Sequence, residues 1–231
     1  MTKKTFMKFS LSVMMLLLAS ACFTACSSDS EEVENEKPSP YGNWTAQGTL
    51  SGERATAVWK LMEGSKAFRV MLSNTSNKAS YHEMNQLFWW DIYSGIDGNG
   101  YGGTLTISGD DTNQYNGKWT VELTFTDMVL QKENRKISFS RATSDSQERL
   151  MANAWTDATG RTTVTFKFGA NGKGVATTES ATRDFTYSYD VDNSLLSLTL
   201  SGSSMSWKGV TFIDNRMVVF DGGSPLVFKK K

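Results

Sequence analysis

Apolar and polar residues alternate along most of this chain beyond residue 40, and this alternation limits the fold more than any other feature. The apolar side chains that share one face of KWTVELTF, residues 118–125, are Trp119, Val121, Leu123 and Phe125. The same period recurs in VTFKF at 164–168, FTYSY at 185–189 and LSLTL at 196–200. A period of two is that of a β-strand with one buried face.

Clusters of Gly, Asn and Asp separate these runs and predict turns. They are GANGKG at 169–174, DVDN at 190–193 and DGGSP at 221–225. A short helix is expected over residues 147–154, and no long helical period occurs elsewhere. The chain therefore reads as antiparallel β-structure built from hairpins.

Two copies of one pattern can be aligned. NWT at 43–45 recurs as AWT at 154–156, 111 positions later, whereas ISFSR at 137–141 recurs as LVFKK at 226–230, 89 positions later. The first copy thus carries about 22 extra residues, which we place between Tyr81 and Tyr101. The sequence predicts two homologous units, residues 41–143 and 149–231.

We therefore expect an all-β protein with two small antiparallel units, each a barrel or a sandwich. At roughly 80 to 100 residues, each unit is short for a full eight-stranded barrel, whose small interior is filled by side chains. Two arrangements stay open. Each unit is a reduced barrel or sandwich of its own, or the two units share strands.

Residues 1–25 have the features of an export signal peptide. Three lysines precede an apolar stretch at 11–21 that is too short to span a bilayer. The small-residue steps before Cys26 and Cys22 both resemble the lipobox of bacterial lipoproteins, in which the cysteine is lipidated and becomes the first residue. We favour Cys26, because the polar segment begins directly after it. An ordinary secretory signal cut near Ala25 is the alternative.

Residues 26–40 form an acidic segment with two prolines and little apolar surface to bury. This composition predicts a disordered tether between a membrane and the folded units. Its beginning, SSDSEE, resembles the signal that sends lipoproteins of the Bacteroidetes to the cell surface. The resemblance implies an outer-membrane lipoprotein that is exposed on the cell surface and is held there by its N-terminal lipid.

Charge and cysteine content exclude two classes of protein. Removal of residues 1–25 takes away three lysines and no acid, which leaves 21 basic and 24 acidic residues. A chain without a basic excess lacks the electrostatic basis for binding nucleic acid. Both cysteines lie in the signal and anchor region, so no disulfide framework is expected in the folded units.

The first unit opens with a Gly-x-Trp step at 42–44, and the second has Asn in place of this Gly at 153. With the later segments TFKFGANGKGVAT, FTYSYDVDNSLLSLTL and MVVFDGGSPLVFKKK, this pattern resembles the lipocalin-like domains of Bacteroidetes lipoproteins. The resemblance covers 150–231 well and 41–143 loosely. It implies that a basic side chain packs over the indole at each barrel base, Arg141 over Trp44 and Lys230 over Trp155. Both roles would be structural.

Few residues carry chemistry. His82 is the only histidine, and no cysteine cluster or nucleophile elbow accompanies it, so we expect an ordinary surface residue, no metal and no cofactor. The loop DGNGYGG at 97–103 offers oxygen ligands for Ca²⁺ but lacks a downstream bidentate Glu, and we expect a mobile turn. A glycosidase with two carboxylates stays open, since such pairs are not local in sequence.

FWWDIY at 88–93 is the densest aromatic cluster and lies in the extra region of the first unit. Alternation puts Phe88 and Trp90 on one face of a strand and Trp89 and Tyr93 on the other. Large apolar faces on both sides of a strand cannot easily meet water. We therefore weigh a strand buried between the two units against a pocket or sugar-stacking platform, with Trp89, Trp90 and Tyr93 beside Asp91.

Three hypotheses about function follow. The first is a non-catalytic lipoprotein that binds a small ligand, a glycan or a partner protein, and it predicts a concave pocket lined by aromatic rings. The second is a structural or assembly subunit of an outer-membrane complex, and it predicts filled barrels and a flat apolar patch. The third, with the least support, is a carboxylate-based glycosidase, and it predicts two carboxylates that converge in a cleft.

Overall fold

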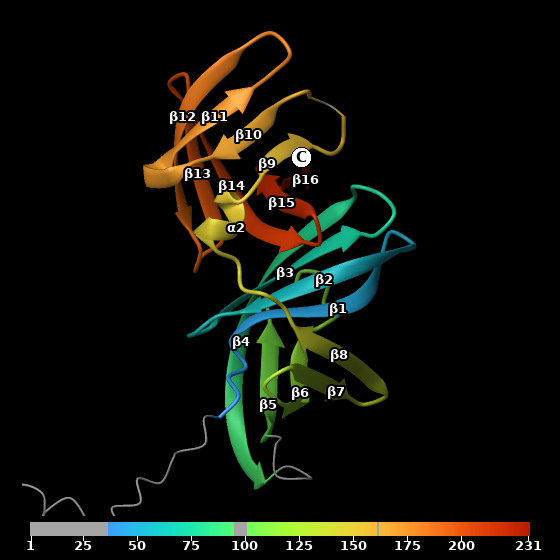
Figure 1. The fold of residues 1–231 in the computed structure, drawn as a ribbon. Helices are drawn as coiled ribbons and strands as arrows, with labels where there is room; N and C mark the ends of the chain where they lie inside the picture. Colours follow the sequence, from blue (N-terminus) through green and yellow to red (C-terminus); the bar gives the residue numbers. More distant parts are fainter. Residues whose placement is uncertain (1–36, 95–100, 161) are drawn as a thin grey trace, which may run out of the picture. The chain divides into compact units, whose positions relative to one another are not determined.

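Two closed antiparallel barrels of eight strands each form the body of the protein (Figure 1). The computed structural model describes residues 37–94, 101–160 and 162–231, and of residues 90–94 only the backbone. The prediction of an all-β protein with two barrel units is confirmed. The open question of architecture is answered as well, because each barrel closes with its own strands. Cys22, Cys26 and the signal peptide lie outside the described residues.

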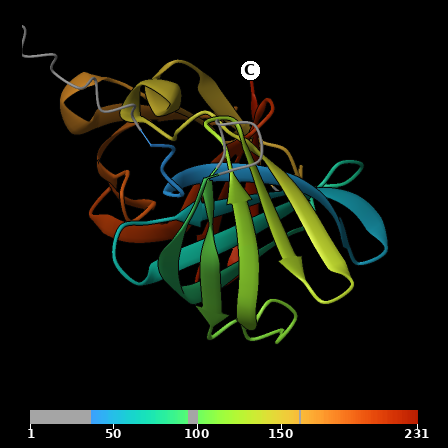
Figure 2. The same cartoon turned by 90° about the horizontal axis from the view of Figure 1, so that it is seen from below.

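The first barrel follows chain order, and its last strand pairs with its first. Figure 2 shows its strands from below, coloured from blue to yellow-green. The strands are β1 (Gly42–Leu50), β2 (Glu53–Leu61), β3 (Lys66–Ser73), β4 (Ala79–Ser94), β5 (Tyr101–Ser108), β6 (Gly117–Leu123), β7 (Asp127–Lys132) and β8 (Arg135–Arg141).

The second barrel closes in the same way, through the pairing of β16 with β9. Its strands are β9 (Ala154–Asp157), β10 (Thr165–Phe168), β11 (Lys173–Thr177), β12 (Thr182–Asp190), β13 (Leu195–Leu200), β14 (Ser203–Ile213), β15 (Arg216–Asp221) and β16 (Ser224–Lys230). A short helix, α2 (Gln147–Met151), precedes it, and one 3₁₀ turn, η1 (Ala170–Gly172), joins β10 to β11. Within the described residues, no helix has the length and apolar character needed to cross a membrane.

The alternation seen in the sequence sets which side chains fill each barrel. On β6, Trp119, Val121 and Leu123 point inward and are buried. Phe125 was expected on the same face, and that prediction is wrong, since β6 ends at Leu123 and Phe125 is 55% exposed. The reason is a turn, in which the Thr124 hydroxyl accepts a hydrogen bond from the backbone N–H of Asp127 at 2.9 Å.

The extra residues of the first copy lengthen existing parts and add no strand. β4 has 16 residues where its counterpart β12 has 9. The β5–β6 connection spans residues 109–116, whereas the β13–β14 turn is residues 201–202. The expected insertion between Tyr81 and Tyr101 therefore accounts for only part of the difference. The second barrel does not lack this region, because β12 stands in the place of β4.

An apolar cluster joins outward-facing side chains of the two barrels. Its buried members are Val58, Phe68, Val70, Leu72, Ile213, Val218, Phe220 and Val227. Through this cluster β3 is buried on both faces from Ala67 to Ser73. The alternative that residues 88–93 form the doubly buried strand is wrong for its described part, since Trp89 is 62% exposed.

Each barrel has two ends, which the turns define. We call "mouth" the end with the four turns β1–β2, β3–β4, β5–β6 and β7–β8, or β9–β10, β11–β12, β13–β14 and β15–β16 in the second barrel. We call "base" the opposite end, where the first strand begins and the last strand ends. Hairpins that alternate around a closed barrel put these turn sets at opposite ends.

Candidate functional site

The base of the first barrel is closed by Trp44 and Arg141. The guanidinium carbon of Arg141 lies 4.0 Å from the centre of the Trp44 ring, at the distance of a cation–π contact. Arg141 Nη1 donates to the Tyr41 carbonyl at 2.9 Å, and Trp44 Nε1 donates to the Pro40 carbonyl at 2.6 Å. These bonds fix the entering chain across the barrel base, so Arg141 and Trp44 have a structural role.

The base of the second barrel is built differently. Lys230 pairs with Trp155 in register, but its side chain is exposed. Trp155 Nε1 donates to the Leu150 carbonyl at 2.8 Å, and its ring lies 5.4 Å from Phe212. The helix α2 thus does at this base what the segment before β1 does in the first barrel.

The mouth of the first barrel is covered by the β5–β6 loop, residues 109–116. Asp110 of this loop is buried, and its Oδ1 lies 3.4 Å from Nη2 of Arg69, which points from β3 into the barrel. The Tyr115 ring lies 4.9 Å from the Trp59 ring and 4.4 Å from the guanidinium carbon of Arg69. An ion pair, an edge-to-face contact of two rings and a cation–π contact therefore fix the loop to the barrel interior.

Asp110 is held in its charged form. Burial by itself raises the pKa of Asp110, but the Thr112 hydroxyl at 2.7 Å, the Tyr115 backbone N–H at 3.0 Å and the Arg69 charge together hold that pKa below its ordinary value. This ion pair was not predicted from the sequence. Its signal was an Arg inside the otherwise apolar run FRVML.

His82 lies at the same mouth and is half-buried. It pairs with Arg69 in register on the inward side of β4, and its Nδ1 lies 2.6 Å from Asp111 Oδ1. In the part of the chain that the structure describes, His82, Asp110 and Asp111 are a group whose ligand atoms lie close enough to share a metal ion. The Asp110 oxygens already accept from Arg69 and Thr112, so the group serves to hold the loop.

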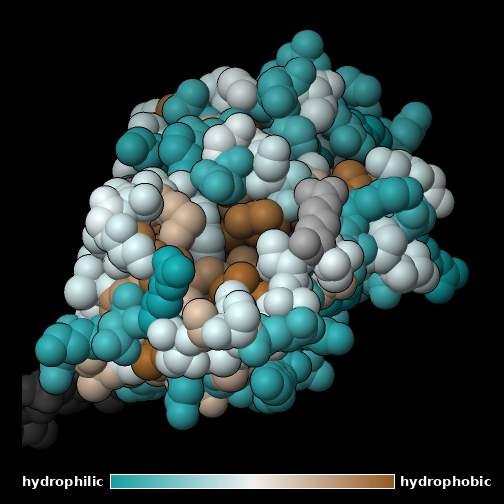
Figure 3. Space-filling view, turned by 90° about the horizontal axis from the view of Figure 1, so that it is seen from above, coloured by the Kyte–Doolittle hydropathy of each residue, from teal (hydrophilic) through white to brown (hydrophobic). Residues whose placement is uncertain are grey.

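At the mouth of the second barrel, the counterpart of that loop is the short β13–β14 turn, residues 201–202, and the longer β9–β10 connection, residues 158–164, is described except for residue 161. Inward-facing apolar side chains near this end are only half-buried, and they are Val164, Leu200, Met205 and Leu226. Seen from above, where the β11–β12 turn lies in Figure 1, the surface is hollowed and apolar side chains line the hollow (Figure 3). This end of the barrel therefore offers an apolar cup to the solvent.

Aromatic rings fill the barrel below the cup. The Phe166 ring lies 5.8 Å from Phe185, 5.5 Å from Trp207 and 5.8 Å from Phe228. Trp207 is 2% exposed, and its Nε1 has no hydrogen-bond partner among the described residues. Buried indole N–H groups normally have a partner, so the aromatic interior of this barrel contains one donor without a partner among the described residues.

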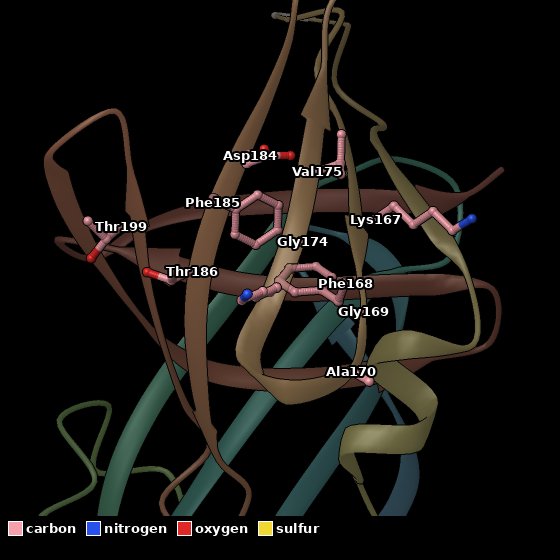
Figure 4. Close-up of a pocket in the computed structure, with 11 residues that line it drawn as sticks. Lys167, Phe168, Gly169, Ala170, Gly174, Val175, Asp184, Phe185, Thr186 and Thr199 are labelled. Atoms are coloured by element: carbon pink, nitrogen blue, oxygen red, sulfur yellow. The ribbon is translucent and has the colours of Figure 1, made fainter.

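A second hollow, of about 750 Å³, lies on the outer wall of the second barrel across β10–β13 (Figure 4). The outward side chains around it are Lys167, Lys173, Val175, Asp184, Thr186 and Thr199. Its floor is Gly174, and the Cζ atom of Phe185 lies 2.3 Å from the position that a Cβ at Gly174 would take. Phe168 and Phe185 are 1% and 3% exposed, so the hollow presents no ring face to a ligand.

A third cavity, of about 610 Å³, has charged walls that include Lys60, Asp145 and Asp192. Lys60 Nζ donates to the Ser194 hydroxyl at 2.9 Å and to the Val191 carbonyl. Burial lowers the pKa of Lys60 and raises the pKa of Asp145. Perturbed groups of this kind in a cleft make it a candidate active site.

The bonds of Asp145 favour a structural role for this cavity. Its Oδ2 accepts from Asn43 Nδ2 at 2.9 Å, and its Oδ1 accepts from the Phe212 backbone N–H at 3.4 Å and lies 3.8 Å from Arg149 Nη1. Both oxygens thus contact groups from the two barrels and from the segment between them. These contacts connect the two barrels, which favours a structural role for Asp145.

The aromatic cluster at 88–93 presents one described ring to solvent. Trp89 is 62% exposed and Leu87 is 51% exposed, both on the outer face of β4. Phe88 packs against the barrel core. The side chains of Trp90, Asp91 and Tyr93 lie outside the described residues, and so do residues 95–100 of the loop considered for Ca²⁺.

Comparison with models of known families, with curated proteins and with solved structures gave no match to this chain. The functional argument therefore depends on the chain's own geometry. In that geometry, one barrel has an open apolar cup at its mouth, whereas the mouth of the other barrel is covered.

Proposed function

We propose that this protein is a non-catalytic binding protein that holds a small apolar ligand in the mouth of its second barrel. A lipid on Cys26 anchors it to the outer membrane, and the acidic tether exposes it on the cell surface. The anchor and location are supported by the sequence of residues 1–40. The ligand site is supported by one observation. Four apolar side chains at this mouth are only half-buried, namely Val164, Leu200, Met205 and Leu226.

The chemistry of the cup limits the ligand. Its wall is aliphatic and thioether, and burial of apolar ligand surface there stabilises a complex by about 25 cal/mol per Å². The rim is polar, with Arg183 Nη1 donating to the Ser201 hydroxyl at 3.3 Å. Packed rings below the cup keep the ligand shallow. These features suit a small molecule with an apolar body and one polar end.

Thermal unfolding with a ligand panel tests the proposal. The mature chain with Cys26→Ser would be heated with short and long fatty acids and with a flat aromatic probe. A ligand present at about 100 times its Kd adds roughly 2.7 kcal/mol of stability. We expect such a shift with at least one ligand and its loss in Leu200→Ser.

Leu50→Ser is the matched control, because Leu50 ends β1 as Leu200 ends β13, and both are half-buried. This variant should keep the shift. The absence of a shift with every ligand, or an equal loss in both variants, would contradict the proposal.

An assembly role is the second candidate, and the first barrel favours it. That barrel is filled, its mouth is covered, and Trp89 and Leu87 are exposed on its wall. Failure of the ligand panel, together with co-purification of the chain with one outer-membrane protein, would favour this role.

A further inference from the structure

The outer wall of the first barrel carries a separate surface, centred on Trp89. A tryptophan that is 62% exposed is unusual, because side chains of this size normally lose most of their surface to the core. Phe88 takes the inward position on β4, which leaves Trp89 on the outer face. The exposed ring does not contribute to the barrel core.

A row of polar side chains runs across the sheet from this ring. Trp89 pairs with Thr104, Thr104 with Thr120, and Thr120 with Gln131. Neighbouring strands lie 4.7–4.9 Å apart, so the row from Trp89 to Gln131 extends about 14 Å. Thr104 is 7% exposed, whereas Thr120 and Gln131 are exposed.

We infer that this row, Trp89, Thr120 and Gln131, binds a neutral oligosaccharide. The indole offers a flat apolar face on which the C–H side of a sugar ring can stack. The Thr hydroxyl and the Gln amide both donate and accept hydrogen bonds, as sugar hydroxyls do. The inference goes beyond the proposed function and uses the other barrel.

Other occupants fit this surface less well. A stable protein partner needs about 1,000 Å² of buried surface with an apolar centre, and among the described side chains of this face of β4 only Leu87 accompanies Trp89 as an exposed apolar group. A membrane surface attracts clusters of apolar or basic residues. The charged neighbours of Thr120 on the same face of β6 are Lys118 and Glu122, which have opposite signs.

Electrophoresis in gels that contain a polysaccharide tests the inference. The mature chain with Cys26→Ser would be run in gels with α-glucan, β-glucan, mannan or xylan. We expect at least one polysaccharide to retard the chain, Trp89→Ala to abolish this retardation, and Gln131→Ala to weaken it several-fold. Trp89→Ala should fold normally, because the ring it removes lies mostly in water.

Two controls separate this inference from other effects. Phe125→Ala removes another exposed ring of the same barrel and should keep full retardation. Leu200→Ser, which disables the proposed apolar cup, should keep it as well, so the failure of one proposal is distinguishable from the failure of the other. Normal mobility in all four polysaccharides, or undiminished retardation of Trp89→Ala, would overturn the inference. Loss of vesicle binding or of self-association in Trp89→Ala, without a polysaccharide effect, would overturn it too.

Discussion

The two barrels have the same strand order, but the mouth of the first is covered by a loop and the mouth of the second is open. In the first barrel, residues 109–116 cover the mouth through the Asp110–Arg69 ion pair and the Tyr115 ring. In the second barrel, the equivalent turn is residues 201–202, and apolar side chains stay half-buried. The comparison teaches that a long β5–β6 connection covers the first mouth, whereas its counterpart in the second barrel, the β13–β14 turn, is too short to do so.

The side chains that fill the two barrels also differ. The first barrel has small alanines at positions 46, 55 and 57 and a buried Arg69, and the Arg69–Asp110 ion pair contributes to closing its mouth. Rings packed around Phe166, most of them edge-to-face, fill the second barrel, so its order depends on packing. Variants that act on charge should therefore affect the first barrel, and variants that act on volume should affect the second.

Loss of the Asp110 carboxylate should have the largest effect. Asp110→Ala leaves the Arg69 guanidinium, 2% exposed, without its partner, and breaking a buried pair costs about 3–5 kcal/mol. We expect a loss of this size in the free energy of unfolding, measured with denaturant.

Two further variants sharpen this test. Asp111→Ala removes an exposed carboxylate and should change stability little. Arg69→Met combined with Asp110→Ala should recover most of the loss, since it removes both charges. An equal loss in Asp110→Ala and Asp111→Ala would show that the ion pair does not hold the loop.

A methyl group in the wall of the second barrel should have an intermediate effect. In Gly174→Ala the new Cβ would lie 2.3 Å from Phe185 Cζ and 2.8 Å from the Lys167 carbonyl, and overpacking of this kind costs about 1–3 kcal/mol. In the first barrel, Gly48→Ala meets only the flexible end of Met71 at 3.1 Å. Calorimetry should show a clearly lower melting temperature for Gly174→Ala alone, and equal melting temperatures would contradict this difference.

Lowering the pH should have the smallest effect, a weak loss of stability at one turn of the first barrel. Hydrogen bonds from Lys78, Ser73 and Ser76 lower the pKa of Glu53 from 4.5 to about 2. The stability that ionised Glu53 contributes is fully present above pH 4.5 and is lost as the pH falls through about 2. The matching turn of the second barrel is held by hydrogen bonds between Thr178 and Ala181, in which no carboxylate takes part.

Hydrogen exchange of residues 74–78 measures this effect. In the wild-type chain, the protection of residues 74–78 against exchange should decrease as the pH is lowered. In Glu53→Gln it should depend less on pH. The protection of residues 178–181 should be the same in both chains. A pH profile of residues 74–78 that is unchanged by Glu53→Gln would mean that the carboxylate does not order the turn.

Local patterns predicted much of the fold and little of the site. Period-two alternation predicted the strands, because that signal is contained in short segments, whereas the contact of Arg141 with Trp44 was predicted from the resemblance to lipocalin-like domains. Barrel closure was not predictable in this way, since the pairings β1–β8 and β9–β16 join distant residues. The covered and open mouths depend on Arg69 meeting Asp110 across the interior, which no single segment records.

The position of Trp89 shows the same limit. Alternation separated it correctly from Phe88, but only the paired strands reveal which face meets solvent. β3 became the doubly buried strand instead, because its outward Phe68, Val70 and Leu72 meet the second barrel.

Photo-crosslinking tests the central contrast most directly. The mature chain with Cys26→Ser would be labelled with a diazirine-bearing fatty acid and mapped by mass spectrometry. We predict labels on peptides that contain Leu200, Met205 or Leu226, competed by unlabelled fatty acid, and none on residues 109–116. Specific labels at 109–116, or none at the second mouth, would contradict a closed first barrel and an open second one.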